Sequence, residues 1–444
     1  MRPRLQNIGM RVPLTGRRGR LGSRQRLGPD ARLLVAGQGV RAAGYGFTAV
    51  SLGALLSARG FSSLQAAVVL TALIAGTALA SLLVGHFGDR LGRRRSYGVF
   101  FAAVAVAGAL VAAGAPFWLL LVIALSGTLS TDVIDNGPAT TLEQSMLAAE
   151  DAGTARAYGL YNAVGATAGA LGSLAVIIPG LGVHGASKVA HGWFFLVLIP
   201  VGAAGFLLAL RLSPAVEVPA AQVDGKSSER RRSGLGPSRR VVRRLAGLFA
   251  VDAGGGGLVT TGFLSFYFTE RYHASLVALG WLFFAVSAVQ AVSVAVAPLL
   301  ARRFGLIATM VGTHLPSNVL LASVAFAPTF PVAAALLLAR TTLSQMDVPT
   351  RQALVMTVVT PGERTAAAAM TNASRYTVRP FGPLIAGLAQ QIALGAPLLI
   401  AGVIKAGYDV TLYGWARHLG LASRIPARSP APREPAAISS EESR

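Results

Sequence analysis

The chain has 444 residues, of which 53% are hydrophobic and 13% are charged. Soluble domains carry about 25% charged residues, so this composition excludes an ordinary soluble globular protein and predicts a polytopic membrane protein. The formal net charge is +22, but the positive side chains are concentrated between and beyond the apolar runs, as membrane topology requires. We therefore expect contact with membrane lipids and no nucleic-acid partner.

Cysteine and histidine usage excludes further classes of protein. The chain has no cysteine, which rules out disulfides, thiolate metal sites and cysteine nucleophiles. Its six histidines show no metal-ligand spacing, and no arrangement of nucleophile and base is recognisable. We expect no metal, no cofactor and no enzymatic activity.

The amino-terminal segment, residues 1–32, holds nine arginines and one acid, Asp30. It has no apolar core, so it is not a secretory signal peptide. We expect a basic cytoplasmic tail; an organelle transit peptide and a start site misplaced upstream of Met10 are the alternatives.

Apolar runs follow, and each is close to the ~20 residues that a helix needs to cross a bilayer. Twelve spans are predicted, at 33–56, 64–87, 96–114, 117–137, 156–179, 192–211, 245–268, 276–300, 305–327, 331–350, 365–393 and 397–415. They divide into an N-terminal six-helix bundle, 33–212, and a C-terminal one, 245–415. The polar segment 213–244 should be a flexible cytoplasmic linker, and residues 416–444 a disordered cytoplasmic tail.

The distribution of arginine predicts the orientation. With a cytoplasmic amino terminus, one side of the membrane receives every arginine-rich segment, namely 1–32, 89–95, 213–244, Arg302-Arg303, Arg351 and the carboxyl tail. Positive charge marks that side as cytoplasmic. We expect a multi-pass protein of the plasma (inner) membrane, monomeric, with both termini in the cytoplasm.

A weak internal repeat joins positions about 210 residues apart, as in transporters built from two similar halves. The matching positions are Asn162 with Asn372, Ala163 with Ala373, Gly172 with Gly382, Leu174 with Leu384, Gly44 and Gly46 with Gly255 and Gly257, and Pro138 with Pro349. Their common offset and order predict two six-span halves of similar structure.

The most specific pattern is GHFGDRLGRRR at 85–95, between the second and third predicted spans. Its defining positions are Gly85, Asp89, Arg90, Gly92, Arg93 and Arg94. A connection this short must turn tightly at the membrane face, and we place its two bends at the two glycines of that set. The second half has a decayed copy, Arg302-Arg303-Phe304-Gly305, without the aspartate.

This pattern resembles the signature loop of the major facilitator superfamily of secondary transporters. The resemblance covers roughly 33–415 and implies an all-α fold of 12 transmembrane helices in two pseudo-symmetric bundles. It also implies that the loop is a gating element at the cytoplasmic face. Asp89 would then accept hydrogen bonds at the start of the eleventh span, near 364–366, and Arg90 and Arg93 would meet acids such as Glu143 or Asp135.

Charged side chains inside predicted spans are the candidates for function, because each is costly in a bilayer without a partner or water. Arg41 and Asp252 lie at matching depths in the first and seventh spans. One interpretation is that both line the central cavity and interact in at least one state. The other is that each is placed independently near the headgroups.

Arg340 and Arg375 fall near mid-depth in the tenth and eleventh spans, while Asp132, Asp135 and Asp347 fall towards the cytoplasmic ends of the fourth and tenth. The arginines could bind an anionic group of the solute, as guanidinium groups do. They could instead pair with these aspartates in a cytoplasmic gate. A desolvated carboxylate is suited to proton coupling, and Asp252, Asp132 and Asp135 are the candidates.

Glycine residues predict where helices bend or pack. The run 254–257 in the seventh span favours either a local break or close packing against a neighbour. Gly165 and Gly169 have the spacing of a packing surface, and Pro380 with Gly382-Pro383 should kink the eleventh span.

The predicted function is a secondary active transporter that moves a small solute by alternating access, with protons as the coupling ion and efflux or exchange as the direction. The drug–proton antiporters of the resembled family often carry an arginine in the fourth span and a Gly-Pro motif in the fifth. Here the fourth span lacks an arginine and the Gly-Pro element lies in the eleventh span, so the case for drug–proton antiport is weaker. The alternative is a transporter-like protein that no longer transports and acts as a membrane sensor or scaffold.

Overall fold

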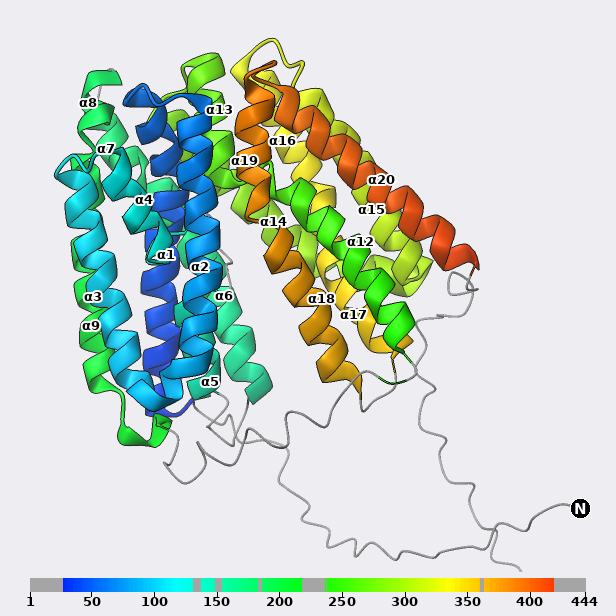
Figure 1. Cartoon of the computed structure of the whole chain (residues 1–444), viewed down its shortest axis with the longest axis horizontal. Helices are drawn as coiled ribbons and strands as arrows, with labels where there is room; N and C mark the ends of the chain where they lie inside the picture. The colour runs from blue at the N-terminus through cyan, green and yellow to red at the C-terminus, as the bar shows by residue number, and fades with distance from the viewer. Residues whose placement is uncertain are drawn as a thin grey trace, which may run out of the picture.

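The computed structural model describes residues 27–130, 137–147, 154–182, 186–217, 236, 238–359 and 363–418. These residues are almost entirely helical and contain no β-strand. The helices form two groups that stand side by side, α1 to α9 in one and α12 to α20 in the other (Figure 1). The predicted all-α fold of two helical bundles is confirmed.

The first bundle supplies the first six spans. Its elements are α1 (Pro29–Ala58), α2 (Ser63–Leu91), α3 (Arg93–Ala112), α4 (Phe117–Leu125), α5 (Pro138–Leu147), α6 (Thr154–Ala175), α7 (Ile177–Gly182), α8 (Ala186–His191), the 3-10 helix η1 (Trp193–Val197), α9 (Leu198–Arg211) and the 3-10 helix η2 (Pro214–Val216). The fourth span differs from its prediction. Its first helix, α4, ends at Leu125 and a second helix, α5, begins at Pro138, so Glu143 lies within the bundle and not in a loop.

The second bundle supplies the other six. Its helices are α12 (Arg239–Gly257), α13 (Thr261–Tyr272), α14 (Leu276–Phe304), α15 (Leu306–Val324), α16 (Phe330–Ser344), α17 (Asp347–Val358), α18 (Arg364–Val378), α19 (Phe381–Gln390) and α20 (Ala396–His418). Helix α12 begins six residues before the predicted seventh span, within the predicted linker. The tenth span does not end at 350 either, because α17 continues it to Val358.

The repeat is visible in the backbone. The chain turns from α2 to α3 at Gly92, with φ +88°, and from α14 to α15 at Gly305, also with φ +88°. Only glycine takes up this backbone conformation without strain, so the decayed copy has kept the turn although it lost the aspartate. Gly85 is not a bend as predicted; it lies inside α2.

Glycine contacts also recur at equivalent places. A Cβ at Gly46 would lie 2.0 Å from the carbonyl oxygen of Gly169, and a Cβ at Gly257 would lie 2.4 Å from that of Arg379. The first and fifth spans therefore cross as closely as the seventh and eleventh do. Both interpretations of the glycine run hold, because α12 ends at Gly257 and the same residue packs tightly.

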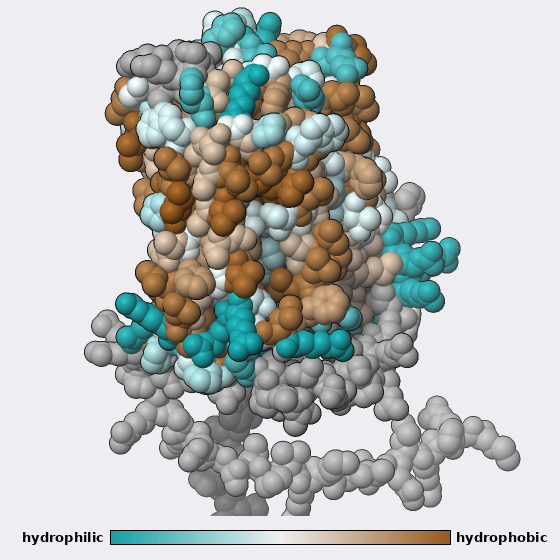
Figure 2. Space-filling view, turned by 60° about the vertical axis from the view of Figure 1, so that its left-hand side comes forward, coloured by the Kyte–Doolittle hydropathy of each residue, from teal (hydrophilic) through white to brown (hydrophobic). Residues whose placement is uncertain are grey.

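The outer surface suits a bilayer. Figure 2 shows a band of apolar side chains between hydrophilic rims. Large side chains such as Leu82, Trp118, Ile178 and Phe326 are 72–75% exposed. Seven stretches of the described helices are long and apolar enough to span a membrane: Ser63–Gly88, Arg93–Ala112, Ala157–Gly182, Trp193–Arg211, Arg239–Tyr272, Leu276–Phe304 and Leu306–Val324.

The two bundles touch through their ends farthest from Arg211, the last residue of α9, and Arg239, the first residue of α12 (Figure 1). Ser265 on α13 donates a hydrogen bond of 2.5 Å to the carbonyl of Val50 on α1. Beyond it, Ser57 donates to the Glu270 carboxylate at 2.7 Å. We call this end of the molecule the far end, and the opposite one the linker end.

The broken helices α18 and α19 join the same contact. The chain kinks between them at Pro380, as predicted. A Cβ at Gly387 on α19 would lie 2.2 Å from that of Ala67 on α2, so these helices meet at nearly the closest approach that backbones allow.

Candidate functional site

The signature loop is held by the segment after α9. The chain turns at Gly92, and α3 begins at the next residue. The Glu217 carboxylate accepts hydrogen bonds from the first backbone N–H groups of this helix, those of Arg93 at 2.7 Å and Arg94 at 3.0 Å. A carboxylate at this place also interacts favourably with the helix dipole. The Arg93 guanidinium donates to the carbonyl of Ser145, 3.2 Å away at the end of α5.

The predicted partners of the loop are only partly observed. Arg93 does reach the end of the fourth span, but Glu143 contacts Arg41 instead. Arg90 is exposed. The side chain of Asp89 and the residues Asp132 and Asp135 lie outside the described part of the molecule, so their predicted contacts stay predictions.

The first bundle contains one buried ion pair. Arg41 on α1 is 2% exposed and Glu143 on α5 is 0% exposed, and their closest N–O distance is 2.9 Å. Tyr97 and Tyr161 donate hydrogen bonds of 2.6 and 2.5 Å to the two carboxylate oxygens. Thr140 lies 2.8 Å from the guanidinium. Because both charges are compensated and hydrogen-bonded, this pair is the arrangement in which a buried ion pair can be tolerated.

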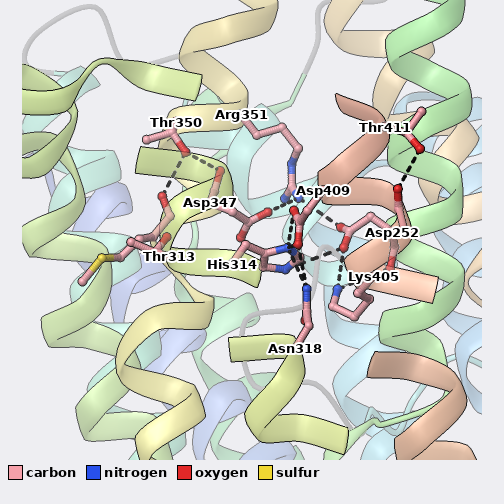
Figure 3. Close-up of polar contacts among 12 residues, drawn as sticks. Asp252, Thr313, His314, Asn318, Asp347, Thr350, Arg351, Lys405, Asp409 and Thr411 are labelled. Atoms are coloured by element: carbon pink, nitrogen blue, oxygen red, sulfur yellow. Dashed lines mark hydrogen bonds and ion pairs between the residues drawn. The ribbon is translucent and has the colours of Figure 1, made fainter. Parts of the chain in front are cut away.

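The second bundle contains a larger charged cluster around Asp252, which is 3% exposed (Figure 3). Lys405 lies 2.5 Å from Oδ1 of this carboxylate, and Arg351 lies 3.3 Å from Oδ2. Arg351 also binds Asp347 at 2.6 Å. Helices α12, α17 and α20 are therefore joined through one carboxylate.

A histidine on α15 extends the cluster. Nδ1 of His314 lies 2.9 and 3.0 Å from the two carboxylate oxygens of Asp409, and its Nε2 lies 3.8 Å from Oδ1 of Asp252. Asn318 donates to Asp409 at 2.8 Å. His314 and its two carboxylate neighbours are at most 3% exposed.

Helical spacing explains why these groups converge. His314 with Asn318, Asp347 with Arg351, and Lys405 with Asp409 are each four residues apart on α15, α17 and α20. Side chains at this spacing lie one above the other on the same face of a helix. Each helix therefore presents a pair of polar groups towards α12, where Asp252 lies two residues before the glycine run.

Arg340 and Arg375 form no ion pair with any acid in the part of the chain that the structure describes. Both are half-buried, their Nε atoms are shielded from solvent without a hydrogen-bond partner, and no hydrogen bond or salt bridge of either side chain occurs among the described residues. Both lie within electrostatic reach of Asp252 and Asp347. Asp347, which was expected to meet them in a gate, binds Arg351 instead.

Several residues depart from their predicted places. Arg351 was expected at the cytoplasmic face, which is wrong: it is 6% exposed within the cluster, because the tenth span runs on through α17. Arg41 and Asp252 belong to separate clusters in this structure and do not meet. His314, Lys405 and Asp409 were missed, although each is an ionisable residue inside a predicted span, which is the signal that singled out the other candidates.

Comparison with known proteins agrees with this architecture. The model of the Major Facilitator Superfamily matches residues 34–383. An uncharacterized membrane protein of Saccharomyces cerevisiae is 24% identical over 416 residues, which cover 86% of this chain and 93% of that protein.

Solved structures show the same fold at low identity. The nucleoside transporter NupG has a TM-score of 0.68 at 15% identity, covering 90% of this chain and 100% of that one. A D-xylose-proton symporter has a TM-score of 0.64 at 16% identity, covering 86% and 97%. Together with the family match over most of its length, these findings place the chain in the Major Facilitator Superfamily of membrane transporters.

Proposed function

We propose that this protein is a proton-coupled secondary transporter that moves a small solute by alternating access, in the direction of efflux or exchange. The observation that carries the proposal is the Asp252 cluster. A carboxylate that is 3% exposed holds a lysine and an arginine from two other helices. Buried ionisable groups are expensive in a membrane protein and are kept where they serve transport.

The position of the cluster supports a role in conformational change. Asp252 lies on α12, five residues before the break at Gly257. Beyond the break, α13 carries the contact of Ser265 with the first bundle. A change in the charge state of the cluster could therefore act on the contact that closes the far end.

Proton coupling fits a carboxylate whose partners can be exchanged. In a dry site, protonation of Asp252 would release Lys405 and Arg351, because the attraction that holds them is lost. Asp132 and Asp135 remain candidates for the same role. Discharge of a pH gradient would then drive the change between the two states.

For the solute, the unpaired arginines favour an anionic group. Arg340 and Arg375 have shielded Nε atoms without partners, and a guanidinium readily binds carboxylate or phosphate. The alternative role of these arginines is to pair with aspartates in a gate. One of those aspartates, Asp347, pairs with Arg351 in this structure.

The signature loop is proposed as the gate of the linker end, through Gly85, Asp89, Arg90, Gly92, Arg93 and Arg94. The hydrogen bonds from Arg93 and Arg94 to Glu217 support this role, because they connect the loop to the segment that follows α9, the last helix of the first bundle. We place the linker end and both termini in the cytoplasm, and the protein in the plasma membrane as a monomer, with lipids around it.

The test is transport by the purified protein in sealed vesicles. A panel of small solutes, including organic anions, is offered with and without an imposed pH gradient. At least one solute should move faster with the gradient, and Asp252→Asn should abolish the stimulation. The matched control is Asp30→Asn, which removes an acid that hydrogen-bonds Ser213 within the first bundle and should keep most of the flux.

The sensor alternative makes the opposite prediction. A protein that only senses would move none of the solutes in the panel. It would also tolerate joint neutralisation of Asp252, Arg340 and Arg375 without loss of its output. Gradient-independent flux in the native protein would contradict the proton coupling alone.

A further inference from the structure

We propose that the coupling proton enters the Asp252 cluster on His314, and not on the Asp252 carboxylate itself, and that protonation of His314 at Nε2 displaces Lys405 from Asp252. This inference rests on the proposed transport function. It adds a residue of the ninth span, in which the sequence predicted no candidate.

The tautomer of His314 follows from its neighbours. Nδ1 faces both carboxylate oxygens of Asp409, at 2.9 and 3.0 Å, so this nitrogen carries a proton and donates it. A carboxylate in this position fixes both the ring orientation and the tautomer of an imidazole. Asn318 donates to the same carboxylate at 2.8 Å and holds it in place.

In the neutral ring, Nε2 then has a lone pair and no proton. That lone pair faces Oδ1 of Asp252 at 3.8 Å, which is longer than a hydrogen bond. Two acceptors therefore oppose each other across a short gap. A proton on Nε2 converts this contact into an attractive, charge-assisted one. The second proton of the ring therefore already faces a carboxylate oxygen that can accept it.

The acceptor that His314 would use is already occupied. Lys405 binds Oδ1 of Asp252 at 2.5 Å, while Arg351 binds Oδ2. A protonated His314 would compete with Lys405 for Oδ1. It also places a second cation beside the ammonium group, which weakens the lysine contact.

Displacement of Lys405 would reach the break in the seventh span. The stem of this side chain lies against the glycine run, since a Cβ at Gly255 would be 2.8 Å from its Cγ. The α12 helix ends two residues later, and the following α13 carries the hydrogen bond to Val50 of the first bundle. Protonation of the imidazole would thus move the lysine, and movement of the lysine would act through the glycine run on the contact between the bundles.

The surrounding charges set the balance for this proton. The ring itself faces Asp252 on α12 and Tyr408 and Asp409 on α20. Arg351 on α17 and Lys405 on α20 bind the same Asp252 carboxylate, Asp347 on α17 binds Arg351, and Arg340 on α16 and Arg375 on α18 lie within electrostatic reach of Asp252 and Asp347. The carboxylates favour the charged imidazole, and the arginines and the lysine oppose it. An anion bound beside Arg340 and Arg375 would therefore favour proton uptake.

The test reads the imidazole directly. The chain has six histidines, so a variant in which His86, His184, His191, His273 and His418 are replaced by Gln retains His314 alone. Its ring nitrogens, labelled with nitrogen-15, are followed by NMR in lipid nanodiscs between pH 4.5 and pH 9 (roughly the range in which imidazoles titrate). Should this variant fold poorly, His314→Gln in the native chain assigns the signal by its disappearance.

We expect the His314 signal to pass from the Nδ1–H tautomer to the doubly protonated ring within this range. Asp409→Asn or Asp252→Asn should each weaken proton binding by about tenfold or more, because a nearby carboxylate typically contributes at least one unit of proton affinity. Asp30→Asn, which removes an acid bonded to Ser213 in the first bundle, should leave the titration unchanged. A ring that never changes its protonation, or that titrates identically in Asp409→Asn, would overturn the proposal.

A flux measurement separates this proposal from transport itself. If the pH gradient drives solute equally well in the native protein and in His314→Gln, the proton enters elsewhere and transport stands. If His314 titrates as expected but the vesicles show no flux with any solute, the proton site stands and the transport function fails.

Discussion

At the scale of single residues, the two buried clusters differ in how completely their charges are paired. Arg41 and Glu143 neutralise each other and bond two tyrosines and a threonine, although Nε of Arg41 has no hydrogen-bond partner among the described residues. The Asp252 cluster is open, since Lys405 and His314 face the same carboxylate oxygen. We infer that the first cluster stabilises its bundle and that the second changes during the working cycle.

This difference predicts the effect of Glu143→Gln. Removal of one partner leaves the Arg41 charge buried and uncompensated, which typically costs about 3–5 kcal/mol. Unfolding in increasing denaturing detergent should show a loss of that order. Tyr161→Phe, which removes the hydrogen bond to the Glu143 carboxylate and the one from Arg41 but leaves the two charges paired, should cost less, about 2 kcal/mol. Equal stability of Glu143→Gln and the native protein would mean that the pair is dispensable to the fold.

Residue types alone predicted part of these clusters. Arg41 and Asp252 were recognisable because charges in apolar spans are rare. Their partners were not, because the direction in which a side chain points depends on how the helices rotate and pack. The same limit misplaced Arg351: its charge suggested a loop, but Asp347 one turn earlier neutralises it inside the bundle.

At the scale of helices, glycine positions decide where the chain turns. Gly92 has a φ of +88°, whereas Gly85 lies inside α2 with nothing within 4 Å of a built Cβ. Both belong to the signature pattern, yet only one needs to be glycine for the fold. The pattern on its own could not distinguish them, since it records residue types and not backbone angles.

This contrast predicts opposite effects of the same substitution. Gly92→Ala should destabilise the protein by about 1 kcal/mol or more, because an alanine is strained at positive φ. Gly85→Ala should be neutral, or stabilising by up to about 1 kcal/mol, since alanine favours a helix. Thermal unfolding of the two variants is the measurement. A larger loss for Gly85→Ala would show that this glycine is needed for a contact absent from this structure.

Most helix positions could be predicted from the sequence, because apolar length and glycine or proline breaks act locally. The predicted break in the seventh span lies at Gly257 and the predicted kink in the eleventh at Pro380. The fourth and tenth spans were placed less well. Their polar residues, among them Glu143 and Arg351, resemble loop residues until their buried partners are known.

At the scale of the whole molecule, contact between the bundles is concentrated at one end. Ser265 with Val50, Ser57 with Glu270, and Gly387 with Ala67 all join them at the far end. In alternating access these contacts must open while the linker end closes, so that the two bundles rock about a site between them. The Asp252 cluster would then exchange neighbours during the cycle, while the Arg41–Glu143 pair stays intact.

The rocking motion is tested most directly by distances between spin labels. The cysteine-free chain accepts pairs of labels at Leu91→Cys with Ala369→Cys on the linker end, and at Ala113→Cys with Thr329→Cys on the far end; all four positions are exposed. Each pair joins one bundle to the other, and the distances are recorded in nanodiscs at high and low pH.

We predict that the two distances change in opposite directions with pH, one pair separating as the other approaches, and that Asp252→Asn removes this response. Asp30→Asn, in the first bundle and away from the label pair of the far end, serves as the control for the effect of losing a carboxylate elsewhere. Distances that stay fixed at every pH, or that lengthen and shorten together, would contradict an account in which two bundles rock under the control of the buried charges.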